Sequence, residues 1–273
     1  MKLSVVILNW NGRKHLERFL PSVVKHTCGD DVEVVVADNG STDDSTMWLR
    51  MTYPEVRTIV LDRNYGFAGG YNRALKHVES EYVVLLNSDV EVTQGWWQPL
   101  VEVLDTEREV AAVAPKLRSV YHPDEFEYAG AAGGFVDYLG YPFCRGRILS
   151  TVERDEGQYD NRRDIFWASG AAMCCRRDVY EELGGFDEEY FAHMEEIDLQ
   201  WRMQLCGWRI MVEPRSVVYH LGGGTLPTSS RKVYLNHRNN LAMLYKCSTT
   251  MQRMVVAVVR PFADMLEAVA YLV

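Results

Sequence analysis

The chain has 273 residues, enough to bury the core of one large α/β domain, and its hydrophobic content of 47% is ordinary for a globular protein. Its 29 Lys and Arg residues against 38 Asp and Glu residues give a formal charge of −9. That charge argues against a nucleic-acid-binding protein, because such proteins usually present a basic surface. The six cysteines form no Cys-x-x-Cys pair, so we expect reduced thiols rather than a zinc site or a disulfide framework.

The first ninety residues alternate between short apolar runs and segments with helical spacing. Continuous apolar β-formers, which suit a sheet covered on both faces, predict strands at 3–8, 32–37, 58–61 and 82–86. Between them, helices are predicted at 15–26, from about residue 44, and at 74–78 after a glycine-rich turn at 64–72. This alternation indicates βαβ units in an α/β fold, with a mostly parallel twisted sheet flanked by helices.

The second half of the chain is less regular. A strand is expected at 110–114, whereas 117–163 shows no recognisable motif and predicts long loops or hairpins. Further on we expect a strand within 166–176, helices at 179–183 and 195–206, and two short strands at 210–213 and 217–220. No uninterrupted stretch of ~20 apolar residues is present, and the N-terminal apolar run is too short for a signal peptide. We therefore expect a cytoplasmic catalytic body.

Polar side chains end three of the predicted strands. In an open α/β sheet, ligands bind at the carboxyl ends of the strands. The residues there are Asn9 and Asn11, Asp38 and Asn39, and Asn87 and Asp89. Alone, Asp89 is more typical of a turn, but a carboxylate in this place suits a Mg²⁺ ion bound to a diphosphate. His220 ends a later strand before three glycines at 222–224, and would supply a second metal ligand.

A second acidic cluster opens the helix predicted at 195–206. Part of it has a structural explanation, because acids favour helix N-termini and Asp198 can pair with Arg202 at i,i+4. With Asp187, Glu188 and Glu189 just upstream, however, the acidity is denser than capping requires. Glu195, Glu196 and Asp198 are therefore our candidates for a general base that deprotonates a hydroxyl.

Taken together, the motifs resemble those of family 2 inverting glycosyltransferases with the GT-A fold, in the branch that includes bacterial rhamnosyltransferases and related surface-polysaccharide enzymes. The resemblance covers roughly residues 2–245. The glycines at 66, 69 and 70 do not fit G-x-G-x-x-G, which argues against a dinucleotide-binding oxidoreductase. The segments that carry the resemblance are VVILNWNG (5–12), VVVADNGSTD (34–43), NYGFAGGYN (64–72), LLNSDVEV (85–92), ASGAAMCCRR (168–177), LGGFDEEYF (183–191), EEIDLQWRMQLCGW (195–208) and VYHLGGGT (218–225).

The resemblance implies a role for each candidate residue. Asn87-Ser88-Asp89 occupies the place of the family's Asp-x-Asp motif, with Asp89 and His220 as ligands of Mn²⁺ or Mg²⁺. Glu196 would be the catalytic base, with Glu195 and Asp198 as alternatives. The remaining nucleotide-sugar contacts would be Asp38, with Asn9 and Asn11 nearby, and Asn64 on the opposite wall.

The resemblance also implies the substrates. The donor would be a nucleoside-diphosphate sugar, dTDP-rhamnose or a UDP-sugar, and the acceptor a hydroxyl of a glycan or lipid-linked oligosaccharide. One alternative is a catalytically inactive GT-A-like module that binds a nucleotide-sugar or glycan. A nucleotidyltransferase fits less well, because Asn9-Trp10-Asn11-Gly12 stands where such enzymes carry a Gly-rich, basic phosphate loop. No sequence feature indicates an oligomeric state.

We divide the chain into a GT-A domain at 1–245 and an amphipathic helical segment at 246–273. The charged residues of this segment, Arg253, Arg260, Asp264 and Glu267, fall along one helical stripe, and Pro261 is expected to kink or restart the helix. Such a helix suits peripheral contact with the inner face of the membrane or with a partner, and packing on the body of the domain fits equally well. Because the sequence ends within an apolar run, we expect the natural chain to continue beyond residue 273 and reach the membrane.

Overall fold

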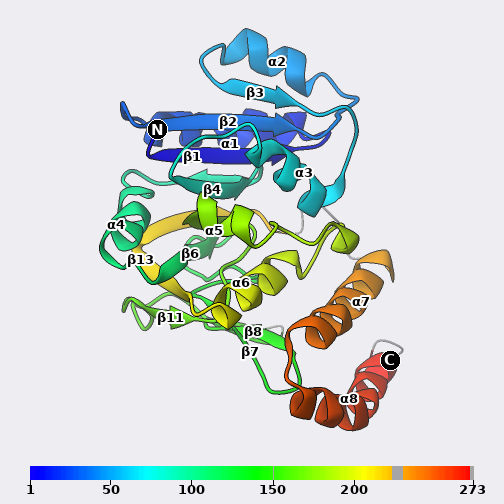
Figure 1. The fold of residues 1–273 in the computed structure, drawn as a ribbon. Coiled ribbons are helices and arrows are strands. Elements are labelled where there is room, and N and C mark those ends of the chain that lie inside the picture. The colour runs from blue at the N-terminus through cyan, green and yellow to red at the C-terminus, as the bar shows by residue number, and fades with distance from the viewer. Residues whose placement is uncertain (150, 223–229, 271–273) are drawn as a thin grey trace.

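A computed structural model of the chain describes residues 1–149, 151–222 and 230–270, the last four without their side chains. Figure 1 shows an α/β body with two C-terminal helices at its periphery. The elements in chain order are β1 (Leu3–Asn9), α1 (Arg13–His26), β2 (Val32–Asp38), α2 (Ser45–Thr52), β3 (Arg57–Val60), α3 (Gly66–Leu75), β4 (Tyr82–Asn87), β5 (Val90–Val92), α4 (Gln98–Thr106), β6 (Val110–Ser119), β7 (Gly134–Val136), β8 (Pro142–Cys144), β9 (Arg147–Ile148), β10 (Thr151–Val152), β11 (Arg163–Ile165), β12 (Ala172–Arg176), α5 (Arg177–Glu182), the 3₁₀ turn η1 (Glu188–Tyr190), α6 (Glu195–Leu205), β13 (Arg209–His220), α7 (Ser230–Cys247) and α8 (Thr250–Ala270).

A nine-stranded sheet forms the centre of the molecule. Its strand order is β11-β13-β6-β12-β4-β1-β2-β3, and the short β5 pairs with β13. Strands β3, β2, β1 and β4 are parallel, as are β6 and β13, whereas β12 runs antiparallel between β4 and β6. The predicted α/β architecture with a mostly parallel sheet is therefore confirmed, and β5, β11 and β12 make the sheet mixed.

Helices cover both faces of this sheet, which explains why its strands are continuous apolar runs. Along β1, Val5 and Ile7 pack on the face covered by α1, α2 and α4, whereas Val6 packs on the face covered by α3, α5 and α6. A third apolar cluster joins α6 and α7 to the segment between β6 and β12, through residues such as Trp201 and Met243. This cluster attaches α7 to the helix that carries the predicted base.

Three elements differ from the sequence prediction. Helix α3 begins at Gly66 rather than near Ala74. Its glycines allow close packing, since a Cβ at Gly70 would lie 2.9 Å from the side chain of Leu8. The two strands expected at 210–213 and 217–220 are one strand, β13, whose register shifts around Pro214. Pro214 has no N–H to donate to a neighbouring strand, and such residues are typical of irregular positions in a sheet. Helix α8 runs through Pro261 without ending.

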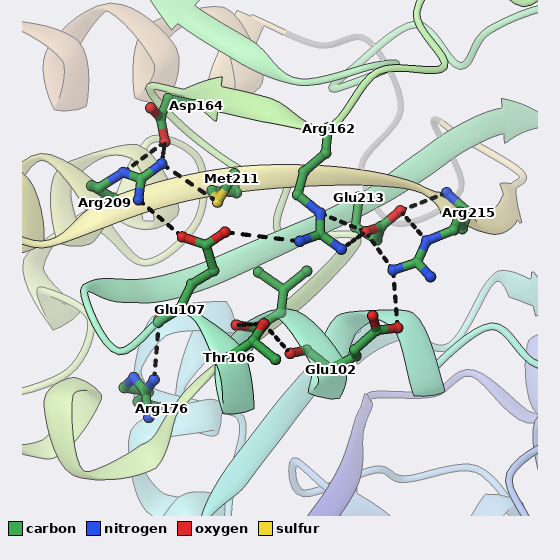
Figure 2. A network of polar contacts seen from close by, with 11 residues as sticks. Glu102, Thr106, Glu107, Arg162, Asp164, Arg176, Arg209, Met211, Glu213 and Arg215 are labelled. Atoms are coloured by element: carbon green, nitrogen blue, oxygen red, sulfur yellow. Dashed lines mark hydrogen bonds and ion pairs between the residues drawn. The ribbon is translucent and has the colours of Figure 1, made fainter.

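The start of β13 is fixed by an ion-pair network at the end of the strand opposite His220. Figure 2 shows Arg209 between Glu107 and Asp164, and Glu213 between Arg162 and Arg215. Glu213 is 2% exposed, and its pKa is lowered because the hydrogen bonds from the two arginines outweigh the effect of burial. The network therefore has a structural explanation and lies away from the predicted site.

Candidate active site

The carboxyl ends of the central strands bring the sequence-predicted polar residues to one edge of the sheet. In the strand register, Asn9 lies opposite Asp38, and Leu8 opposite Asn87. His220 pairs with Val90 of β5, and the N–H of Leu221 donates to the Asp89 carbonyl at 3.1 Å. Asp89 and His220 are 131 positions apart in the sequence, and this short antiparallel ladder places them side by side.

Two buried carboxylates flank the imidazole of His220. Its Nε2 lies 3.3 Å from Asp89 Oδ1, and its Nδ1 lies 3.3 Å from Glu127 Oε1. Asp89, Glu127 and His220 are 2%, 4% and 8% exposed. Burial would lower the pKa of His220, but the contacts with Asp89 and Glu127 outweigh it and raise the pKa to about 10. The buried carboxylates of Asp89 and Glu127 thus favour a positive charge between or beside them.

The residues present fit a divalent cation that is shared with a substrate. Both carboxylate oxygens of Asp89 are buried, and apart from the 3.3 Å contact of Oδ1 with His220 neither has a hydrogen-bond partner among the described residues. Across the described residues, no group of three or more His, Cys, Asp or Glu side chains forms a complete metal cage. Mg²⁺ and Mn²⁺ accept few protein ligands when phosphate oxygens complete the coordination. Glu127 is on the other side of the ring, where a carboxylate commonly orients a metal-binding histidine.

Asn9 and Asp38 organise the adjacent loop. Asn9 Nδ2 donates to Asp38 Oδ1 at 2.9 Å, and Asp38 Oδ2 accepts from the N–H of Ser41 at 3.0 Å. Both residues are buried, and Asn9 Oδ1 has no partner. Gly12 approaches them so closely that a Cβ there would lie 2.4 Å from Asn9 Oδ1 and 3.7 Å from Ser88 Oγ. Only a residue without a side chain fits there, so the loop stays against the end of β4.

Asn11 and Asn64 fix backbone turns on the two sides of this loop. Asn11 Oδ1 accepts from the N–H groups of Thr42 (2.7 Å) and Asp43 (3.2 Å). Asn64 Oδ1 accepts from the N–H of Gly66, the first residue of α3, at 2.8 Å. Asn39, which is 1% exposed, joins the two sides by donating to Asn64 Oδ1 at 3.1 Å. The predicted nucleotide-binding residues therefore form one connected wall.

Glu195 and Glu196 begin α6 as a second pair of acids. Glu195 is 4% exposed, Glu196 is partly buried, and each has one buried oxygen without a partner. Burial raises the pKa of Glu195 well above its ordinary value, and repulsion from Glu196 raises it further. Burial also raises the pKa of Glu196, against backbone hydrogen bonds that lower it. A carboxyl group with a raised pKa and a free oxygen is suited to take a proton.

Asp198 has a different environment. Its Oδ2 accepts from Arg202 Nε at 2.8 Å, as the i,i+4 spacing predicts, and its Oδ1 pairs with Lys246 Nζ at 2.8 Å and accepts from Tyr190 Oη at 3.1 Å. The residue is fully buried. Both oxygens are therefore committed to joining α6, α7 and η1, so the geometry favours Glu196 and Glu195 over Asp198 as the base.

Residues 170–171 link the two acidic groups. The N–H of Asn87 donates to the Ala171 carbonyl at 2.9 Å, next to Ser88 and Asp89. A Cβ at Gly170 would lie 3.7 Å from the Glu196 carboxyl carbon and 3.3 Å from the ring of Phe67. The segment just before β12 thus contacts the end of β4 on one side and Glu196 on the other.

Glu127 was not among the sequence-predicted site residues, and Asn39 was predicted at the strand ends without a role of its own. Glu127 comes from the stretch 117–163, whose pattern predicted only loops or hairpins, and nothing in its sequence neighbourhood distinguishes it. Asn39 follows Asp38 at a strand end, and that position was the available indication of a role. The glycines at 223 and 224 lie outside the described residues, whereas Gly222 passes so near Glu127 that a Cβ would lie 3.1 Å from Oε1.

Comparison with known proteins identifies the family. Residues 4–184 match the family described as "Glycosyl transferase family 2". The chain belongs to glycosyl transferase family 2. This glycosyltransferase is 31% identical over 236 residues to an N-acetylglucosaminyl-diphospho-decaprenol L-rhamnosyltransferase of Mycobacterium tuberculosis, covering 80% of this chain and 75% of the relative. It therefore belongs to the rhamnosyltransferase-like branch of the family.

Solved structures show that the glycosyltransferase has the GT-A fold. One is GalNAc-T7 with UDP, GalNAc and Mn²⁺, with a TM-score of 0.67 and 19% identity; the match covers 90% of this chain and just under half, 48%, of that protein. Another is the mannosyltransferase PcManGT from Pyrobaculum calidifontis in complex with GDP-Man and Mn²⁺, with a TM-score of 0.62 and 17% identity. The second match covers 99% of this chain and 75% of that protein.

Proposed function

We propose that this glycosyltransferase moves a sugar from a nucleoside-diphosphate sugar to a hydroxyl of a glycan or lipid-linked acceptor, with inversion and with a divalent metal. The observation that carries the proposal is the pair of buried acidic groups linked through residues 170–171. Asp89 and His220 form one group, which suits a metal and a diphosphate. Glu195 and Glu196 form the other, which suits proton removal from an acceptor.

On the donor side, the protein binds and orients. Asp89 and His220 would hold Mn²⁺ or Mg²⁺, which when bound neutralises charge on the leaving diphosphate. The wall formed by Asn9, Asp38 and Asn64 would take the nucleoside. The amide of Asn87 and the hydroxyl of Ser88, beside Asp89, would contact the sugar or the phosphates. In this reading Asn87 leaves Asp89 as the single metal-binding carboxylate of the Asn-x-Asp segment.

On the acceptor side, Glu196 takes the proton. The acceptor oxygen attacks the anomeric carbon from the face opposite the diphosphate, the bond from that carbon to the phosphate oxygen breaks, and the diphosphate leaves with the electron pair. The hydroxyl proton passes to Glu196. A single displacement of this kind inverts the configuration at the anomeric carbon. The raised pKa of Glu196 matches the base more closely to neutral pH.

A panel of nucleotide-sugars would identify the donor. Purified protein with Mn²⁺ is incubated with dTDP-rhamnose and UDP-sugars, with and without a diphospholipid-linked N-acetylglucosamine acceptor, and release of nucleoside diphosphate is measured. We expect release with one donor that increases with acceptor, and a product of inverted anomeric configuration by NMR. Our preference for rhamnose as the sugar and for a lipid-linked acceptor is supported by the mycobacterial relative, an N-acetylglucosaminyl-diphospho-decaprenol L-rhamnosyltransferase. Tight donor binding without release from any donor would instead favour the inactive binding module.

Glu127 provides a test of the metal group that does not depend on turnover. We expect Glu127→Ala to weaken Mn²⁺ binding about 10- to 100-fold, because partners that orient metal-binding histidines have effects of this size. Glu127→Gln keeps an oxygen that can accept from Nδ1–H and should retain most of the affinity. Calorimetric titration with Mn²⁺ and nucleoside diphosphate measures both. Equal binding by the protein and the alanine variant would contradict an orienting role.

Helix α8 supports the proposed contact with a membrane. Two of its polar residues face the protein: Arg260 is 2% exposed and donates to the Leu139 carbonyl, and Asp264 accepts from Tyr141 Oη at 2.6 Å. Val256 packs in the core, but most of the helix's described apolar residues face outward, and the following are each more than half exposed: Met251, Met254, Val258, Phe262, Met265 and Leu266. This orientation is the reverse of a helix that buries its apolar face against its own domain.

Charge favours an anionic bilayer as the surface that this face contacts. Of the 29 Lys and Arg residues, six lie in 230–270, together with only two of the 38 Asp and Glu residues. The two C-terminal helices are thus basic although the whole chain is acidic, and basic residues beside an apolar face favour anionic lipids. None of the described helices has the length and hydropathy needed to cross a bilayer. The end of the apolar run, residues 271–273, lies outside the described residues.

A vesicle assay tests this contact. Val258→Glu combined with Phe262→Glu places charge on the exposed face of α8 and should lower co-sedimentation with phosphatidylglycerol vesicles at least about tenfold. Met51→Glu is the matched control, because Met51 is an apolar residue of α2 that is 79% exposed. We expect the control to bind as the unchanged protein does. Equal sedimentation of all three proteins would contradict membrane contact through α8.

A further inference from the structure

The four residues before α6 have an unusual backbone. In this segment, which we call the 191–194 loop, Phe191, His193 and Met194 have φ angles of 64°, 73° and 71°. Residues with side chains rarely adopt this left-handed region, at a cost of order 1–3 kcal/mol each. The loop therefore persists only because its surroundings hold it. Glu195 and Glu196 follow it directly.

One side chain accounts for most of the support. Asn239 of α7 is fully buried, and its Nδ2 donates to the carbonyls of Tyr190, Ala192 and His193 at 3.0, 2.9 and 2.7 Å. Its neighbour Arg238 donates through Nη2 to the Glu189 carbonyl at 2.6 Å and through Nε to Asn239 Oδ1 at 2.8 Å. Arg238 thus fixes the orientation of the Asn239 amide, and the amide donates to three carbonyl groups.

The other carbonyls of the loop are bound by the two adjoining helices. That of Phe191 accepts from the N–H groups of Phe67 and Ala68, at the start of α3, at 2.8 and 3.4 Å. That of Met194 accepts from the N–H of Asp198, in the first turn of α6, at 2.9 Å. Every backbone carbonyl from Glu189 to Met194 therefore has a partner, as buried backbone requires. Two of them, the carbonyls of Ala192 and His193, have Asn239 as their partner and no other within the described part of the chain.

The loop determines where the acidic pair points. Helix α6 has no side-chain cap, since its N-cap residue is Met194 in the left-handed conformation. The dihedral angles of the 191–194 loop thus set the direction in which the first residues of α6 project. We propose that Asn239 is a positioning residue, which fixes the 191–194 loop and thereby holds Glu196 toward the acceptor. This inference rests on the proposed role of Glu196 as the base.

The variant Asn239→Asp tests the inference. It has nearly the same shape, but it removes both N–H donors and places carboxyl oxygens against three carbonyl oxygens. We expect kcat to fall about a hundredfold, the size of effect that a displacement of about 1 Å can have. The KM for the donor should stay within about twofold, because the donor residues other than Asn64 lie at the ends of β1, β2, β4 and β13.

Asn240→Ala is the matched control. Asn240 is the next residue of α7, is 2% exposed, and donates through Nδ2 to the Gly140 carbonyl at 2.8 Å. Its contact with the loop, 3.9 Å from Nδ2 to Met194 Sδ, is with a side chain rather than with a backbone carbonyl. This control loses a buried hydrogen bond and should lower thermal stability while keeping kcat. If the two variants lose activity only in proportion to their unfolded fractions, Asn239 has a structural role alone and the inference is overturned.

A pH profile and hydrogen exchange separate the remaining outcomes. Burial raises the pKa of Glu196, so a loop that opens to water should move the acid limb of kcat to lower pH in Asn239→Asp, but not in Asn240→Ala. Amide exchange of residues 188–198, and of Phe67 and Ala68, should increase only in Asn239→Asp. Unchanged exchange would overturn the inference even if no donor were turned over. If the protein without any substitution released no nucleoside diphosphate, that result would refute the proposed function rather than the role of Asn239.

Discussion

Glu196→Gln should lower the rate of sugar transfer by about 10²- to 10⁴-fold, the usual contribution of a general base. Gln has the size of Glu and cannot accept the acceptor's proton, so the chemistry is lost while the shape of the site is kept. Donor affinity should change little, because Asp89, His220 and Asn9 lie at the ends of strands, whereas Glu196 belongs to α6. The measurements are initial rates of nucleoside diphosphate release and calorimetric binding of the donor analogue.

Glu195→Gln is the control for this experiment, because Glu195 is the adjacent acid with a raised pKa. We expect it to lower activity less than Glu196→Gln does. In the unchanged protein, activity requires a deprotonated base, so it should fall as pH falls through a pKa above the ordinary 4.5 of a glutamate. Full activity of Glu196→Gln together with loss in Glu195→Gln would transfer the role of base to Glu195.

Asp89→Asn should lower activity about a hundredfold or more, because it removes the one carboxylate proposed to bind the metal and keeps its size. A metal can supply several kcal/mol of charge stabilisation on a leaving diphosphate, which corresponds to an effect of this scale. EDTA should silence the unchanged protein, and Mn²⁺ or Mg²⁺ should restore it. Restoration is not expected in Asp89→Asn at the same metal concentration.

The control for the metal experiment is Asp38→Asn, which alters another buried acid at the same sheet edge. Its carboxylate accepts from Asn9 and Ser41, so we expect weaker nucleotide binding with an unchanged requirement for metal. Full activity of the unchanged protein in excess EDTA would contradict the metal role of Asp89 and His220. That result would leave the assignment of Glu196 standing.

The sequence predicted the parts of the fold in which local pattern and tertiary structure agree. Continuous apolar runs placed β1, β2 and β4 within a residue of their observed ends, because both faces of the sheet are covered. The sequence predicted a start of α3 that is too far along the chain, because glycine is a poor helix former in isolation. The close approach of Gly70 to Leu8, which is visible only in the folded chain, explains why glycine is used at that position. Strand β13 was divided in two because Pro214 and Arg215 interrupt its apolar pattern.

The site was predictable where residue type and strand position coincide. Asp89 follows β4 and His220 ends β13, and His220 Nε2 lies 3.3 Å from Asp89 Oδ1. Glu127 was not predictable, because it reaches His220 from a segment without periodicity, and only the folded chain places it there. The ion pair of Asp198 with Lys246 was equally hidden, because its partner belongs to a helix that lies far along the chain. Residue type alone does not distinguish a base from a structural carboxylate.

The dependence of the 191–194 loop on α7 has a consequence for the order in which the enzyme matures. On the ribosome, Glu195 and Glu196 emerge before Asn239, and the strands that surround them can pair while α7 is still unmade. Until α7 docks, the strained backbone next to the acidic pair lacks the hydrogen bonds that Asn239 donates. The newly made chain is therefore expected to acquire its nucleotide wall first and its catalytic competence last, when its C-terminal helices are complete.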